Sequence, residues 1–370
     1  MARLLTTPAQ AREHVGAGPG GNHLGFSRSC RMTRGSMVIG ADEPSGGTRD
    51  DRDRGFLSAL VADGRPLLAV TAVALVACGA VAMFLAATGH FLPQDVQYLG
   101  MSAADLCSLN GCRIVHFMEH DRTAFGGALV AIGILYLWLV TFPLGAGEPW
   151  AWWTLALSGG AGFASFLAYL GYGYLDTWHG AATLALLPCY GFGLMRARGL
   201  LPEIAGFRTL TRPAPGPPWI SAGGLGRLLL ITTGAGMLVG GGTVLIVGMT
   251  SVFVPQDLRF MGIDEAGLLA INPRLIPLIA HDRAGFGGAI GAAGLTVLLC
   301  VWRGRASRSL WQALALAAGT GFIAAIGVHF LIGYTDLSHL APAYLGAAIC
   351  AAGLALFYPA CCLTGPNQGR

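Results

Sequence analysis

The strongest constraint on this chain is that one pattern of polar residues occurs in it twice. The tripeptides that return are Pro93-Gln94-Asp95 as Pro255-Gln256-Asp257, and His120-Asp121-Arg122 as His281-Asp282-Arg283. Further along, a Gly-Tyr-x-Asp-x-x-His segment runs over 173–179 and again over 333–339. Such a repeat indicates two copies of one structural unit, each with its own histidines, aspartates and arginine.

These polar residues stand in strongly apolar surroundings. Of the 370 residues, 54% are hydrophobic and only 11% are charged, whereas a soluble domain carries roughly 25% charged residues. This composition predicts an integral membrane protein that has the lipid bilayer as its main partner, and it predicts no nucleic-acid partner. Because ionisable residues are costly in a bilayer, the repeated ones are functional candidates.

Eight segments are apolar over roughly the 20 residues that a membrane helix needs. They run approximately over 67–89, 123–144, 151–172, 179–195, 228–250, 284–302, 311–332 and 340–362. We therefore predict an all-α polytopic membrane protein with eight transmembrane helices in two tandem four-helix repeats. Since each repeat holds an even number of helices, the repeats are expected to be parallel.

The same pattern divides the chain into four regions. Residues 1–66 are polar and rich in Gly, Arg and Asp, which predicts a disordered cytoplasmic segment. Residues 67–196 and 227–363 are the two predicted membrane repeats. Residues 197–226, rich in Pro, Gly and Arg, form a predicted cytoplasmic linker.

The arginines predict the orientation, because basic residues gather on the cytoplasmic side. With both termini inside, most arginines lie in cytoplasmic segments. Those left for the outer segments are Arg113, Arg122, Arg259, Arg274 and Arg283. We therefore expect a multi-pass protein of the cell membrane with cytoplasmic N- and C-termini, and with every repeated polar motif at the outer face.

Four repeated histidines are the main site candidates. Histidines on facing helices of a bundle commonly hold a haem iron from both sides, so we predict one axial pair in each repeat, around a haem b group. The predicted pairs are His120 with His179, and His281 with His339. The neighbouring residues expected to orient the imidazoles, or to cap the helices, are Asp121, Arg122, Asp176, Asp282, Arg283 and Asp336.

Other interpretations of these residues stay open. Polar residues at helix starts also act as caps, and a His-Asp-Arg segment can form an ion-paired brace between a loop and a helix. The leading hypothesis is a haem-binding redox or haem-modifying protein that exchanges electrons with quinone or a membrane redox partner. The alternatives are a transporter or channel-like protein with an outer polar vestibule, and a membrane assembly protein that binds a partner through its outer loops.

Over residues 67–362 this arrangement resembles the haem A synthases in architecture. That family has two tandem four-helix bundles with histidines on the second, fourth, sixth and eighth helices. It also has a cysteine pair in an outer loop and an acidic residue near the first histidine. The resemblance implies a haem-binding bundle of similar build, with a disulfide between Cys107 and Cys112 and with Glu119 as the catalytic acid.

Overall fold

Helices account for all the regular structure of the described chain. The computed structural model describes residues 61–167, 174, 177–202 and 206–363, and these belong to the unit Arg54–Arg370. No strand occurs among them. The predicted disordered region 1–66 lies outside the described residues up to position 60, and Asp176 also lies outside them.

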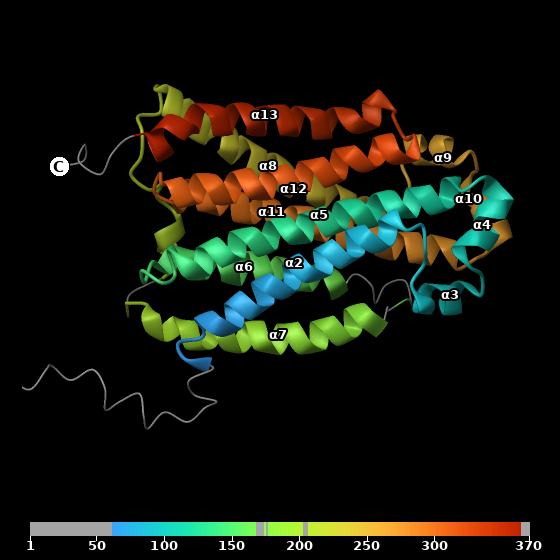
Figure 1. Cartoon of the computed structure of the whole chain (residues 1–370), viewed down its shortest axis with the longest axis horizontal. Helices are drawn as coiled ribbons and strands as arrows, with labels where there is room; N and C mark the ends of the chain where they lie inside the picture. Colours follow the sequence, from blue (N-terminus) through green and yellow to red (C-terminus); the bar gives the residue numbers. More distant parts are fainter. Residues whose placement is uncertain (1–60, 168–173, 175–176, 203–205, 364–370) are drawn as a thin grey trace, which may run out of the picture. The chain divides into compact units, whose positions relative to one another are not determined.

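Long helices run roughly side by side, and short helices gather at one end of them (Figure 1). The long helices are α2 (Arg65–Ala87), α5 (Arg113–Thr141), α6 (Pro149–Ser165), α7 (Thr177–Ala197), α8 (Ala222–Met249), α11 (Leu275–Arg303), α12 (Arg308–Ile332) and α13 (Leu337–Cys362). The short helices at that end are α3 (Pro93–Leu99), α4 (Ala103–Asn110), α9 (Pro255–Met261) and α10 (Glu265–Ile271). Two 3-10 turns, η2 (Arg198–Leu200) and η3 (Phe207–Leu210), lie in the predicted linker.

Six of these helices are long and apolar enough to cross a membrane, namely α2, α5, α8, α11, α12 and α13. Helix α6 has 17 described residues and α7 has 21, and neither is among the six. Large apolar side chains such as Phe84, Ile246 and Leu331 are exposed on their helices. Exposed apolar surface on helices with internally satisfied backbones favours a bilayer as the surrounding solvent.

Helices α5 and α11 form the centre of this unit. In their most apolar stretches 72% of the residues are buried, against 17–22% in the other four candidate spans. Helix α5 contacts α2, α12 and α11, while α11 contacts α8, α6 and α5. Helix α6 therefore packs on α11, while its neighbour α7 packs on α2. In the same way α12 packs on α5, while α13 packs on α8.

The repeated Phe-Gly-Gly-Ala segments allow these close approaches. A Cβ atom at Gly126 would lie 2.6 Å from the Gly79 carbonyl oxygen of α2, and one at Gly287 would lie 2.8 Å from the Gly241 carbonyl oxygen of α8. The next glycine in each segment faces the other way. There a Cβ atom would collide with α12 in one copy and with α6 in the other. Two adjacent glycines thus let each central helix touch two neighbours.

The central helices begin earlier than hydropathy predicted. Helix α5 starts at Arg113 and α11 at Leu275, whereas the predicted spans start at 123 and 284. Both His-Asp-Arg motifs therefore lie within helices and not at their first turn. Hydropathy misses this stretch because it scores each ionisable residue as exposed, while here the arginines and aspartates form buried ion pairs.

Candidate functional site

The two His-Asp-Arg motifs bind each other across the contact between α5 and α11. Arg122 donates from Nε to Asp282 Oδ2 at 2.8 Å. In return, Arg283 donates from Nε to Asp121 Oδ2 at 3.2 Å. All four side chains are largely buried. Each arginine therefore serves the aspartate of the other motif and not the one beside it in the sequence.

The Pro-Gln-Asp motifs complete the same two networks. The second guanidinium nitrogen of Arg122 lies 2.9 Å from Asp95 Oδ2, and that of Arg283 lies 2.7 Å from Asp257 Oδ2. Each of these aspartates also accepts a hydrogen bond from the backbone N–H that precedes its short helix, α3 or α9. Each Pro-Gln-Asp motif lies at the start of a short helix. It caps a helix and also supplies a buried carboxylate.

The tyrosine of each Gly-Tyr segment bonds to the same carboxylate. Tyr174 donates to Asp95 Oδ1 at 2.5 Å, and Tyr334 donates to Asp257 Oδ1 at 2.8 Å. Burial, and then the neighbouring Asp257 carboxylate, raise the pKa of Tyr334 well above its ordinary value. The phenol therefore stays protonated and remains a donor.

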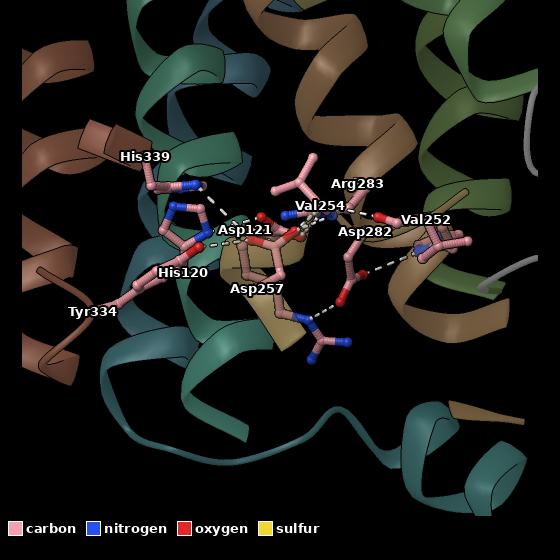
Figure 2. Close-up of polar contacts among 11 residues, drawn as sticks. His120, Asp121, Val252, Val254, Asp257, Asp282, Arg283, Tyr334 and His339 are labelled. Atoms are coloured by element: carbon pink, nitrogen blue, oxygen red, sulfur yellow. Dashed lines mark hydrogen bonds and ion pairs between the residues drawn. The ribbon is translucent and has the colours of Figure 1, made fainter. Parts of the chain in front are cut away.

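Each network also orients a histidine, as Figure 2 shows for His120. Nδ1 of His120 lies 2.9 Å from Asp121 Oδ1, and Nδ1 of His281 lies 3.1 Å from Asp282 Oδ1. An ionised aspartate that pairs with arginine can only accept hydrogen bonds. Nδ1–H of each histidine is therefore the donor, and Nε2 carries the lone pair of the neutral ring. A carboxylate on Nδ1 is the usual way to present Nε2 to a metal.

The histidines pair differently from the prediction. The ring centroids of His179 and His281 are 5.2 Å apart, and those of His120 and His339 are 5.7 Å apart. Each pair thus joins one histidine from the first half of the sequence to one from the second. The prediction paired histidines within each half, whereas the rings that lie together come from different halves, since α6 packs on α11 and α12 packs on α5.

A third histidine joins the second pair. His329 of α12 lies with its ring centroid 4.3 Å from that of His120 and 5.3 Å from that of His339. His329 has no histidine at the matching place in the first half of the sequence, so the repeat did not single it out. The one available signal was its position, one helical turn before Gly333-Tyr334.

A cavity opens beside the first pair. Its empty volume is about 610 Å³, open solvent at the mouth included, and its walls include His179, His281, Arg122 and Phe125. A second cavity of about 470 Å³ shares Phe125 as a wall residue and continues along α6. Mostly apolar walls of this kind are common at ligand sites.

Each network holds two aspartates and a single arginine, so a negative charge remains in both. Asp95 and Asp282 share Arg122 beside the cavity, while Asp121 and Asp257 share Arg283 beside the three histidines. Buried charge is costly unless it is compensated. Both networks are therefore suited to a bound cation or a cationic cofactor.

The remaining predicted residues lie outside these networks. Asp336 caps α13 by accepting from the His339 N–H, and the Ser338 hydroxyl lowers the pKa of this aspartate. Cys107 and Cys112 form a disulfide beside α4. Glu119 is half-buried, and its carboxylate makes no hydrogen bond or ion pair within the described part of the chain. The structure therefore does not bring Glu119 into either network.

Two asparagines tie the short helices together reciprocally. Asn110 donates from Nδ2 to the Met261 carbonyl at 3.1 Å, and Asn272 donates to the Leu99 carbonyl at 2.8 Å. These asparagines match each other in the repeat. They fix α4 on α9 and the end of α10 on α3. The four short helices are thereby held together at the end of the long helices where they gather.

Comparison with known proteins gives no match, whether with protein-family models, curated proteins or solved structures. The contacts, charges and cavity described above are therefore the basis for interpreting this site.

Proposed function

We propose that this chain is a haem-binding membrane protein with an electron-transfer or haem-modifying role. The observation that carries the proposal is the His179–His281 pair, 5.2 Å between ring centroids, at the wall of a mostly apolar cavity. Two imidazoles from different helices are a common ligand set for haem iron. The resemblance to haem A synthases agrees with a haem-binding bundle.

The residues present fit such a group. The walls of the cavity are mostly apolar, as the walls of cofactor sites are. The ferric porphyrin core is cationic, and it would balance the charge left by Asp95 and Asp282 around Arg122.

The roles of the chain's own residues follow from their contacts. Asp282 accepts from His281 Nδ1 and so fixes the direction of Nε2, while Arg122 holds Asp282 in place. Phe125 and Phe166 pack around His179, with ring centroids about 6 Å away. When bound, the haem would supply one-electron redox chemistry, with quinone or a membrane redox protein as the partner class.

The architecture that we propose for this function has two parallel four-helix repeats, with α6 and α7 also crossing the membrane. Helices α6 and α12 each pack on the central helix of the other repeat, and each histidine pair is shared between the repeats. The arginine distribution favours cytoplasmic termini in the cell membrane and puts the two networks near the outer face. A haem there is accessible to partners at that surface.

The test is the visible spectrum of the detergent-purified chain, oxidised and dithionite-reduced, after expression with a haem precursor. We expect a Soret band and sharp reduced α and β bands. These should be lost in His281→Ala and kept in His116→Ala, because His116 of α5 makes no hydrogen bond or ion pair with either network within the described part of the chain. A colourless, well-folded wild-type protein would refute the proposal. A spectrum lost in His339→Ala but kept in His281→Ala would refute the assigned pair.

The alternative is a transporter with a polar vestibule, as the sequence allowed. The observation in its favour is the cavity itself, which has Arg122 and Asp95 in its wall. Against it, both residues are already held in a buried ion pair at 2.9 Å. A carrier needs such groups to exchange partners during transport. A stabilising shift of the melting temperature by a polar solute, in a colourless protein, would favour this alternative, whereas co-purifying subunits would favour an assembly role.

A further inference from the structure

Three histidines lie together at the second network, which is built around Arg283. They are separate from the His179–His281 pair at the cavity. His120, His329 and His339 come from α5, α12 and α13, and their nearest ligand nitrogens all lie within 4.8 Å of one another. His120 and His329 are buried, and His339 is half-buried. Three separate helices thus direct imidazoles to one point.

The hydrogen bonds leave the ring nitrogens in the state that a metal requires. His329 donates from Nδ1 to the Ala325 carbonyl at 2.7 Å, so its Nε2 carries the lone pair. That Nε2 is buried and has no hydrogen-bond partner among the described residues. His120 donates from Nδ1 to Asp121, which leaves the lone pair on Nε2 of its neutral ring. A buried acceptor without a donor needs an explanation, and a metal ion provides one.

The charge around the cluster also favours a cation. Asp121 and Asp257 face a single arginine, Arg283, which lies 3.2 Å from one carboxylate and 2.7 Å from the other. Tyr334 closes the cluster on the side of Asp257, with its ring stacked on His339 at 4.5 Å between centroids. Figure 2 shows His120, His339 and Tyr334 grouped beside these aspartates. Two carboxylates and one guanidinium therefore lie next to three imidazoles, an environment that favours a bound cation.

We propose that His120, His329 and His339 bind a late first-row transition-metal ion, zinc or copper. Neutral imidazoles suit these metals, and three of them leave a coordination position open. Bonds of about 2 Å place tetrahedral ligand nitrogens about 3.3 Å apart, so metal binding draws the rings together by at most about 1.5 Å.

This site is distinct from the proposed haem site. The repeat aligns His329 with Tyr169, so only the second half of the sequence supplies a third imidazole. The cavity pair has two histidines and space beside them, whereas this cluster has three rings within contact distance. The two sites thus lie on one repeated scaffold and differ in the ligand that each of them holds.

The test uses the full chain, stripped with chelator and dialysed against Zn²⁺ or against Cu⁺ under ascorbate. Inductively coupled plasma mass spectrometry should give about one ion per chain, and the melting temperature should rise because the ion ties α12 and α13 to α5. His329→Tyr, which copies the residue of the first half, should lose the ion. His116→Ala should keep it. His281→Ala should lose haem and keep the ion, which separates this proposal from the proposed function.

A second variant and a direct probe distinguish loss of the metal site from loss of the fold. Asp121→Asn keeps all three ligands and should weaken metal binding about 10–100-fold. Co²⁺ added to the wild-type chain should give the visible d–d bands of a tetrahedral nitrogen site. Metal content equal in wild type and His329→Tyr would overturn the proposal. So would an absence of metal in the wild type, or a second haem that is lost in His339→Ala.

Discussion

Replacing Arg283 by methionine tests whether the crossed ion pairs hold the two central helices together. Arg283 donates to Asp121 and Asp257, and its guanidinium also donates to the Val252 carbonyl at 2.8 Å. Methionine fills a similar length without any donor. The substitution therefore leaves two buried carboxylates and a buried carbonyl without their common partner.

The size of the effect follows from burial. Removing one partner of a buried ion pair costs about 3–5 kcal/mol, because the other charge stays buried and uncompensated. The side chain of Arg283 is 6% exposed, and both carboxylates are fully buried. By contrast, Arg259 is 67% exposed and lies 3.8 Å from Asp336. An exposed pair of that kind contributes about 0–1 kcal/mol.

The assay is thermal unfolding in detergent, followed by fluorescence-detected size exclusion. At about 2–4 °C per kcal/mol, Arg283→Met should lower the melting temperature by about 6–20 °C. Arg259→Ala is the control and should lower it by less than about 4 °C. Arg122→Met should match Arg283→Met, because Arg122 makes the corresponding two ion pairs.

A double variant separates charge from packing. Adding Asp257→Asn to Arg283→Met removes one of the two uncompensated carboxylates, so the double variant should regain part of the lost stability. If Arg283→Met unfolds within about 2 °C of the wild type, the buried network contributes no stability. If Asp257→Asn only adds to the loss, the effect comes from packing and not from charge.

Three further predictions follow from single contacts. Gly287→Ala should destabilise the chain by about 1–3 kcal/mol, because the new Cβ atom meets the backbone of α8, whereas Gly291→Ala, with open space around it, should be neutral or slightly stabilising in the same unfolding assay. The pKa of Asp336 is lowered in the folded chain, so its contribution to stability is present above the unfolded pKa of about 3.9 and is lost as pH falls through the folded pKa. The melting temperature should therefore fall toward acid pH in a profile between about pH 3 and 7. Asp336→Asn should remove this part of the fall. In intact cells, a membrane-impermeant maleimide should label Cys107 and Cys112 only after reduction, and labelling without reduction, or only after lysis, would contradict the disulfide or its outer position.

The sequence identified the important side chains more successfully than their partners. The His-Asp-Arg and Pro-Gln-Asp motifs were selected because ionisable residues need a reason to occur in an apolar chain, and both motifs enter the two networks. A brace between loop and helix was one interpretation of His-Asp-Arg, and the contacts of Arg122 with Asp95 fit it. The crossing between the two copies, Arg122 to Asp282, was not predicted.

The packing of α6 on α11 and of α12 on α5 could not be predicted, for a physical reason. Both central helices carry the same Phe-Gly-Gly-Ala face, so α6 finds matching surfaces on α5 and on α11. Two similar copies can pack within themselves or with each other, and connection lengths and side chains outside the motifs decide between these packings. Hydropathy and spacing carry no information on that choice. The prediction of histidine pairs within each half failed at this step.

His329 shows a different limit of sequence reasoning. A single histidine in an apolar segment gives no pattern, and only the fold brings its ring to 4.3 Å from His120. Its contact with the Ala325 carbonyl, four residues earlier, is also typical of an ordinary core histidine. What distinguishes it is the Nε2 atom, buried and without a donor, which a three-dimensional structure alone reveals.

Through the crossed ion pairs, each arginine holds the aspartate that orients the histidine of the other motif. Arg122 follows His120 closely in the sequence, yet it holds Asp282, the residue that orients His281. Arg283 likewise holds Asp121, which orients His120. Loss of Arg122 should therefore disturb the cavity histidine first and leave the three-histidine cluster with its own aspartates and arginine. Because α5 carries one half of each network and α11 the other, a relative shift of these two helices changes the support of both sites at once.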